Sequence, residues 1–321
     1  MDDNSNKANP RVALYDPLQK DAWDQFVRDS KQGHFMFRRD YMEYHADRFL
    51  DHSLMFYAGD RLSALMASSR DGNTFISHGG LTFGGVISNR KMKVAATLQV
   101  FESLVEYLGT AGITRMVYKA IPHIYHSWPA EEDLYALFRC GATLVRRDVS
   151  STIDLRGGSR LSKGRKWAIN QSRKNSIEVS GSNDFAAFMQ IEKQVLAEKY
   201  VTTPVHTATE IELLHNRFPD NIRLYGAFHS GQMVGGVIVY ATETVAHTQY
   251  MAATQEARDL CALDAVLSKL INEEYADRKF FDFGISTEKS GHYLNEDLAA
   301  FKESWGASGV VYDTYELMIG G

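Results

Sequence analysis

The sequence predicts an α/β fold with a mixed sheet, of α+β character, in which one unit of strands and helices is present twice. Each half of the chain has two β-rich runs around a short turn, a third run, an amphipathic helix, a short apolar run, a second helix and a last β-rich run. The second helices end alike, in "DLYALFRCGA" and "DLAAFKESWGA". We therefore expect two domains, 1–157 and 158–321, joined near 155–162, with a cleft between or along them.

The first half contains each of these elements in turn. The hairpin turns at Gly59-Asp60, and the apolar face of the long helix includes Leu98, Phe101 and Leu104. The expected elements are, in order, a helix (21–30), a hairpin (53–68), a strand (73–80), the long helix, a buried strand (113–121), a helix (131–142) and a closing strand (143–155).

The second half repeats the order. Its hairpin turns at 229–231, and the apolar positions Leu263, Val266, Leu267 and Leu270 have the spacing of an amphipathic helix. The short apolar strand at 279–286 is typical of a strand covered on both faces. The expected elements are a helix (184–200), a hairpin (223–242), a strand (244–254), the amphipathic helix, the apolar strand, a helix (295–305) and a last strand (309–319).

The composition of the 321 residues is that of a well-cored globular protein, with 44% hydrophobic and 23% charged residues. No apolar run approaches the roughly 20 residues that span a membrane, and the polar, acidic start "MDDNSNKANP" differs from a signal peptide. Two cysteines, Cys140 and Cys261, exclude a disulfide framework or a cysteine-rich zinc site. We expect a cytoplasmic protein with no metal site and no membrane span.

Charge is unevenly distributed along the chain. The formal net charge of −5 gives no overall attraction to nucleic acid, so DNA is not an expected partner. However, the stretch 156–174, "RGGSRLSKGRKWAINQSRK", contains no acidic residue. It is either a solvated helix face or an anion-binding surface for a phosphorylated substrate, CoA or RNA, in which Lys163, Arg165 and Lys166 would contact phosphate.

The triplet Asp282-Phe283-Gly284 is the one that protein kinases use to hold magnesium. A kinase also needs a glycine-rich loop, a strand lysine and a catalytic loop upstream, and none of these precedes the triplet. The kinase interpretation is therefore excluded. The triplet instead ends a buried strand, and open α/β sheets usually bind their ligands at the carboxyl ends of strands.

The order hairpin, strand, helix, strand, helix, strand resembles the GNAT acyltransferase fold. Two such units in one chain, with "FDFG" (281–284) followed by "FKESWG" (301–306), resemble the Fem-type branch, the peptidoglycan-bridge aminoacyltransferases and their relatives in bacterial polysaccharide pathways. The resemblance covers nearly the whole chain by element order, through short motifs. It implies acyl transfer to an amine, with an acyl-CoA or an aminoacyl-tRNA as the donor.

The donor-binding motif departs from the pattern of CoA-dependent GNAT enzymes. Those enzymes carry Q/R-x-x-G-x-G/A, whose backbone N–H groups bind the pyrophosphate at a helix N-terminus. In the corresponding "QEARDLCALDAV", Arg258 and Leu260 replace the glycines. Arg258 would then contact phosphate through its side chain. No inserted helical arm of the kind found in some bridge-forming Fem enzymes is evident in the sequence.

The resemblance assigns the acyl-donor channel to Phe301 and Lys302, because a Phe-Lys pair lines it in Fem-type enzymes. Lys302 would stabilise developing negative charge or contact donor phosphate, unless it is a surface lysine. Asp282, at the end of the buried strand, would orient the substrate amine or act as a base, unless it caps the following turn.

The strand "VAHTQYM" carries the remaining candidates. His247 and Tyr250 would reach the cleft, His247 as a substrate-binding and Tyr250 as a catalytic side chain, unless both are ordinary sheet-face residues. The backbone N–H groups of Met251 and Ala252 would bind the donor and its oxyanion.

These expectations converge on an N-acyltransferase that uses acyl-CoA to modify an amine of a cell-envelope or polysaccharide precursor. The acidic charge and the missing arm favour CoA over aminoacyl-tRNA as the donor. Two alternatives stay open, an aminoacyl-tRNA-dependent Fem-type transferase and a non-catalytic double-GNAT module that binds a nucleotide-sugar or a protein. The sequence does not indicate the acyl group, the acceptor or the oligomeric state.

Overall fold

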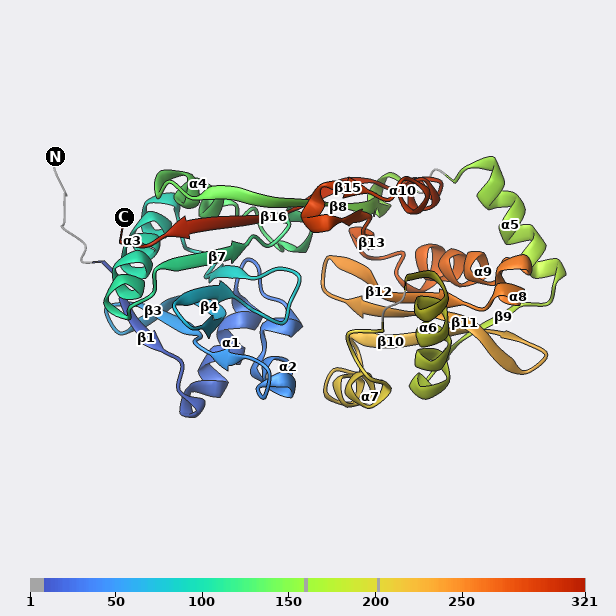
Figure 1. Ribbon diagram of the computed structural model, residues 1–321, viewed down its shortest axis with the longest axis horizontal. Helices are drawn as coiled ribbons and strands as arrows, with labels where there is room; N and C mark the ends of the chain where they lie inside the picture. Colours follow the sequence, from blue (N-terminus) through green and yellow to red (C-terminus); the bar gives the residue numbers. More distant parts are fainter. Residues whose placement is uncertain (1–8, 159–160, 201–202, 321) are drawn as a thin grey trace. The chain divides into compact units, whose positions relative to one another are not determined.

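The computed structural model describes residues 9–158, 161–200 and 203–320 (Figure 1). Its helices and strands confirm the predicted mixed α/β fold. Contacts divide the chain into two compact units: the first holds the residues up to Arg147 and those from Val311 on, and the second holds Asp148–Val310. These units differ from two consecutive halves. The expected pair of GNAT-like domains, 1–157 and 158–321, stays a prediction.

The first unit is built on a sheet in the order β1-β3-β4-β5-β7-β16, with β2 and β6 also paired to β4. Its pairings are antiparallel except for β5 with β7, which is parallel. Its elements are β1 (Arg11–Leu14), α1 (Lys20–Asp29), α2 (Arg39–Met42), β2 (Leu50–Asp51), β3 (Leu54–Ala58), β4 (Arg61–Asp71), β5 (Thr74–Ser77), β6 (Gly85–Ser88), α3 (Val94–Thr110), β7 (Arg115–Lys119) and α4 (Glu132–Arg139).

The predicted apolar face of α3 forms the core of the first unit. Phe101, Leu104 and Leu108 are fully buried and pack with Phe56 and Met116 of the sheet. Side chains spaced at i, i+3 and i+7 lie on one face of a helix. This segment therefore buries its apolar residues as a helix packed on the sheet, which a strand could not do.

The second unit has a sheet in the order β8-β13-β12-β11-β10-β9. Its pairings are again antiparallel except for one, β12 with β13. Its elements are α5 (Lys163–Lys174), β9 (Glu178–Ser182), α6 (Phe185–Tyr200), α7 (Ala208–Arg217), β10 (Ile222–His229), β11 (Gln232–Ala241), β12 (Val245–Ala253), α8 (Gln255–Asp259), α9 (Ala262–Lys269), β13 (Phe280–Ile285), β14 (Thr287–Glu288), β15 (Tyr293–Leu294) and α10 (Glu296–Glu303).

Two long strands complete these sheets by exchange. β8 (Thr143–Asp154) closes the first half of the sequence, yet its residues 150–154 pair with β13 of the second unit. β16 (Ser308–Met318) closes the second half, yet its residues 314–318 pair with β7 of the first unit. Each half of the sequence therefore supplies the strand that completes the other half's sheet.

Helices cover both faces of the sheet in the second unit. Val266 and Leu267 of α9 pack with Val237 and Val239 in a core on one face. α6 crosses the other face (Figure 1), where a Cβ on Gly236 would lie 3.2 Å from Phe188. Glycine at this position allows α6 to approach the strand closely.

A β-bulge interrupts β12. Tyr250 pairs with Ile238 and Thr248 pairs with Val239, so Gln249 is an extra residue. A regular strand would place side chains three residues apart on opposite faces. The bulge instead brings His247 and Tyr250 onto the same face of β12.

Candidate active site

β12 and β13 separate halfway along the second unit. Their parallel pairing covers three rungs and ends where His247 pairs with Asp282. Beyond that rung β12 runs on to Ala253, while β13 turns away through Gly284, whose φ is +76°. Among the described residues, no strand pairs with this edge of β12 beyond the last rung with β13. An extended ligand can lie against the backbone at such an edge.

Asp282 is fully buried at this point of separation. Its Oδ1 accepts hydrogen bonds from the hydroxyls of Ser150 and Thr152, the latter at 2.7 Å, and both hydroxyls come from the exchanged strand β8. Burial by itself raises the pKa of Asp282, but the hydrogen bonds and the nearby His247 outweigh burial and lower the pKa to about 2. The carboxylate therefore stays ionised and is a weak base.

His247 is held by that carboxylate. Its Nδ1 lies 2.8 Å from Asp282 Oδ2. Because an ionised carboxylate only accepts, Nδ1 carries a proton, and Nε2 is the ring nitrogen left to exchange a proton with a ligand. The ring is partly exposed, and Gly284 leaves room beside it, since a Cβ there would lie 3.2 Å from His247 Cε1. The pair has the chemistry of a histidine base positioned by an aspartate.

Lys302 of α10 is buried rather than at the surface, with 3% of its area exposed. Its ammonium donates hydrogen bonds of 2.8 Å to the carbonyl oxygens of Gly284 and Ile285. Burial lowers its pKa to about 8, although the charge of Asp282 opposes this shift. Lys302 thus fixes the end of β13 where the strand leaves β12.

A groove of about 390 Å³ crosses the open end of β12. Four residues that the sequence analysis assigned to donor binding line it: Met251, Ala252, Arg258 and Phe301. Its other lining residues come from α5, α6, β12, α9 and α10 and are Arg165, Glu192, Val195, Leu196, Ala253, Cys261, Ala262, Leu263, Asp264 and Leu298.

One end of the groove is suited to an anion. The N-cap of α9 is Cys261, which adopts the left-handed conformation with φ +59° that glycine usually supplies. Arg258 lies in the short helix α8, just before Cys261. Arg165 reaches the same end of the groove, where it pairs with Asp264 at 2.7 Å and stacks over Phe301. The first turn of α9 and two guanidinium groups therefore lie together at this end of the groove.

Glu192 is a groove residue that the sequence analysis missed. Only 7% of its area is exposed, and burial raises the pKa of its carboxyl to about 7. The sequence did carry a signal, because Glu192 interrupts the apolar stripe of Phe185, Phe188, Met189 and Leu196 on α6. An acid in such a stripe is costly unless the site uses it.

The remaining predicted residues are not among those that line the groove; they are His247, Asp282, Lys302, Tyr250, Lys163 and Lys166. Tyr250 is buried, and its hydroxyl lies 2.6 Å from Nδ1 of His206, so it links β12 to the segment before α7. Lys163 and Lys166 are on the exposed face of α5, whereas Arg165 on the same helix reaches the groove. The roles that the sequence analysis gave to these residues stay predictions.

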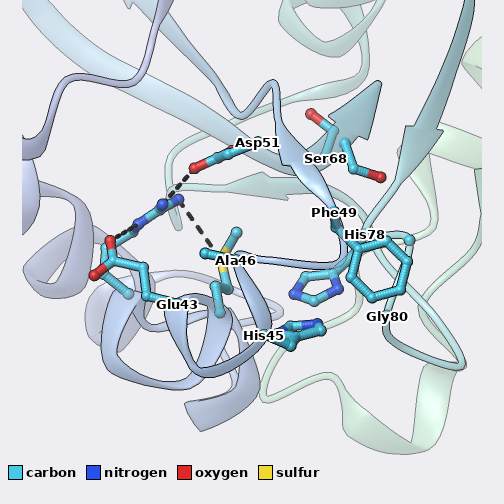
Figure 2. A pocket seen from close by; sticks show the side chains of 12 residues that line it. Glu43, His45, Ala46, Phe49, Asp51, Ser68, His78 and Gly80 are labelled. Atoms are coloured by element: carbon cyan, nitrogen blue, oxygen red, sulfur yellow. Dashed lines mark hydrogen bonds and ion pairs between the residues drawn. The ribbon is translucent and has the colours of Figure 1, made fainter. Parts of the chain in front are cut away.

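The first unit has cavities of two sizes. One, of about 410 Å³, lies between the turn from β3 to β4 and the start of α3. The other is much smaller (Figure 2). Its volume is about 40 Å³, which has room for about one water molecule. The rings of His45 and His78 stack beside it at a centroid distance of 5.8 Å, and Arg39 at its edge pairs with Glu43 and Asp51. We take the groove of the second unit as the candidate active site because the same unit holds the open end of β12 and the His247–Asp282 pair.

Comparison with known families identifies the second unit. Residues 159–302 match the model of the acetyltransferase (GNAT) domain. This segment has a GNAT fold. The matched residues run from before α5 to Lys302 in α10. They therefore include the groove lining and the residues His247, Asp282 and Lys302. A search of curated proteins found no significant match.

Solved structures extend the likeness to the whole chain. FemX covers 96% of this chain and 97% of its own, with 10% identity and a TM-score of 0.67. L-PGS from Bacillus licheniformis covers 96% and 93%, with 12% identity and a TM-score of 0.63. A tandem GNAT protein from the clavulanic acid biosynthesis pathway covers 97% and 99%, with 13% identity and a TM-score of 0.50. The resemblance to the Fem-type branch of the GNAT fold is confirmed at the level of fold.

The described residues lack two features that would indicate a membrane or a metal ion as a partner. No helix within 9–158, 161–200 and 203–320 combines the length and apolar character needed to cross a bilayer. In the same ranges, no three histidine, cysteine or acidic side chains gather as ligands for a metal ion.

Proposed function

We propose that the protein is an N-acyltransferase that moves an acyl group from acyl-CoA to an amine. The observation that carries the proposal is the pair His247–Asp282 at the point where β12 and β13 separate, beside a groove lined by the following residues of β12. The acceptor we propose is an amine of a cell-envelope or polysaccharide precursor. Its support is the fold shared with FemX and L-PGS.

The donor site is assigned by its chemistry. CoA supplies the thioester that activates the acyl group, and it carries phosphates that need cationic partners. Arg258, Arg165 and the N–H groups at the start of α9 would bind the pyrophosphate. The backbone of Met251 and Ala252 would hold the acyl carbonyl, since this edge of β12 lies beyond its last rung with β13.

His247 is the proposed general base. Its Nε2 would take the proton of the attacking amine, while Asp282 fixes the ring orientation and stabilises the imidazolium that forms. This interpretation moves the role of base from Asp282, whose pKa of about 2 makes it a poor proton acceptor, to the histidine beside it.

Lys302 is the proposed electrostatic and positioning group. Its ammonium is buried next to the end of β13, and its two hydrogen bonds hold Gly284 and Ile285 in place. A buried positive charge at this position would favour negative charge that develops on the acyl oxygen. Replacing Lys302 by Met keeps the side-chain length and removes both effects.

Donor binding is the first test. Acetyl-CoA and longer acyl-CoAs are added to the full chain, and the melting temperature is followed. At a hundredfold excess over the dissociation constant, binding stabilises the folded state by about 2.7 kcal/mol. Arg258→Ala should weaken the response. If no acyl-CoA stabilises the protein, the donor assignment is wrong and aminoacyl-tRNA becomes the next donor to test.

Catalysis is the second test. CoA release is measured with acetyl-CoA and a panel of primary amines, including ethanolamine, glucosamine and an aminoacyl ester. His247→Asn keeps an amide that can donate to Asp282 but removes the base, so turnover should fall by about 10²–10⁴-fold with donor binding unchanged. His229→Asn, on β10 and outside the groove lining, is the matched control. A wild-type chain that binds acyl-CoA without any turnover would favour the non-catalytic module.

A further inference from the structure

Helix α5 has one face that is exposed among the residues that the structure describes. Ala168, Ile169 and Ser172 are buried on its inner side, which packs against α9 (Figure 1). At 3.6 residues per turn, the opposite side presents a coherent set of exposed residues. They are Lys163, Lys166, Trp167, Asn170, Arg173 and Lys174.

This outer face of α5 is cationic. The helix "KGRKWAINQSRK" has no acidic residue, although the whole chain has a formal net charge of −5. Within the part of the chain that the structure describes, Arg165 is the only cation of this helix in an ion pair, and its partner is Asp264. Lys163, Lys166, Arg173 and Lys174 therefore keep their charge toward solvent, where an anionic surface would be attracted.

A tryptophan lies among these cations. Trp167 is 61% exposed, whereas Trp23 and Trp305 are fully buried. On the helix, Trp167 is close in angle to Lys163, four residues before it, and to Lys174, seven residues after it. An indole has an apolar body and a polar N–H, and it favours the boundary between lipid headgroups and acyl chains.

We infer that the outer face of α5 binds the surface of an anionic lipid bilayer. The four lysine and arginine side chains would lie among the lipid headgroups, and Trp167 would insert at the interface. This inference does not depend on the proposed function. It rests on the charge and exposure of one helix and holds whatever the donor and acceptor are.

The shape of this face favours a bilayer over RNA. Single-stranded RNA is usually bound in a cationic groove that follows its backbone, with several aromatic side chains stacking successive bases. The outer face of α5 is one side of a single helix, and Trp167 is its one exposed aromatic side chain. A planar surface can contact all of its cations and the indole together.

Vesicle binding tests the inference with the full chain. Sedimentation is measured with vesicles of equimolar phosphatidylglycerol and phosphatidylcholine and with phosphatidylcholine alone. We expect binding to the anionic vesicles only, and weaker binding at high salt. Lys166→Gln/Lys174→Gln should reduce the partition coefficient about thirtyfold. Lys91→Gln/Lys93→Gln removes the same charge from two exposed lysines of the first unit and should leave binding unchanged.

Fluorescence gives a second, independent measurement. Trp128, in the first unit, is 53% exposed, so Trp128→Phe leaves Trp167 as the one exposed tryptophan of the chain. In that variant the emission should shift to the blue with anionic vesicles, and Trp167→Ala should abolish the shift. The inference is overturned if anionic vesicles do not bind, if the Lys91/Lys93 control loses binding equally, or if the chain binds total RNA but not the vesicles.

Discussion

The two units share a topology but differ at one rung of the sheet. In each, an antiparallel set of strands leads through a helix to a single parallel pairing, β5 with β7 in the first unit and β12 with β13 in the second. The last parallel rung is Ile76 with Val117 in the first unit and His247 with Asp282 in the second. The same backbone position therefore carries an apolar pair in one unit and a polar, charged pair in the other.

This difference shows where chemistry can occur. Burying the ionised Asp282 requires the hydroxyls of Ser150 and Thr152 and the ring of His247. Ile76 and Val117 need no such partners. At this rung, partners for a buried charge are present in the second unit, where the groove crosses the open end of β12. We therefore expect the chemistry in the second unit and a structural or acceptor-binding role for the first.

The largest predicted effect tests the strand exchange. Leu317 and Ile319 are buried in the first unit, although they belong to the end of the second half of the sequence. Leu317→Ala/Ile319→Ala should lower the stability of the first unit by about 4–10 kcal/mol, because each truncation of a buried aliphatic side chain costs about 2–5 kcal/mol. Hydrogen exchange should show loss of protection in β5 and β7 before β12.

The control lies between these two residues. Met318 is 62% exposed, so Met318→Ala should change stability little. The exchange also predicts that a fragment ending at Gly157, which lacks β16, does not fold by itself. A fragment 1–157 with native-like thermal unfolding would show that each sequence half is self-sufficient and that the exchange carries little free energy.

The second prediction compares the two parallel rungs directly. Asp282→Asn removes the charge that orients His247, so turnover should fall by about 10²–10⁴-fold while acyl-CoA binding persists. Val117→Thr places a polar group of the same shape at the equivalent rung of the first unit, and turnover should stay within about twofold. Equal losses in both variants would mean that the measured effect is on folding rather than on the histidine.

Element order was predictable because it depends on local periodicity, and Asp282 stood out because it is an acid in a short apolar run. It was expected at the end of the strand, whereas β13 continues past it to Ile285. The sheet that each closing strand joins was not predictable, because the residue patterns of β8 and β16 suit either sheet. Nor was the bulge at Gln249, which no local signal marks and which decides that His247 and Tyr250 share a face. The sequence placed Lys302 in the donor channel by resemblance, but its burial against two carbonyls required the fold.

The third prediction concerns acid stability of the first unit. Burial and the charge of Lys119 hold the pKa of His78 well below its usual value of 6.5. The unfolded chain therefore binds this proton more readily, and the stability contributed by the neutral ring is lost as pH falls below about 6.5. The melting temperature of the first unit should drop on acidification. His78→Asn should reduce the drop, because Asn does not titrate and tolerates the φ of +51° at this position. His229→Asn in the second unit should leave the drop unchanged.

The smallest predicted effect contrasts the buried acids of the two units. Asp133 accepts hydrogen bonds from Tyr118 at 2.6 Å and from the Leu134 N–H at 2.9 Å, and burial raises its pKa to about 6. Glu192 is also buried, and its pKa is raised to about 7, but no residue in the described ranges donates a hydrogen bond to it in the groove. The folded protein therefore holds the proton of Glu192 more tightly than the unfolded chain does. Its contribution to the free energy of unfolding falls as pH rises from 4.5, the pKa in the unfolded chain, to about 7, the pKa in the folded protein.

Glu192→Gln should therefore stabilise the second unit by about 1–2 kcal/mol at pH 8 and by little below pH 5. Asp133→Asn should destabilise the first unit by about 1–3 kcal/mol at pH 8, because an amide has one acceptor oxygen for two donors. Chemical denaturation at pH 8 and below pH 5 measures the change in the free energy of unfolding for each variant. If Glu192→Gln instead destabilises the protein at pH 8, the carboxylate is a structural hydrogen-bond acceptor like Asp133. Stabilisation would mark it as a strained group kept for the ligand of the groove.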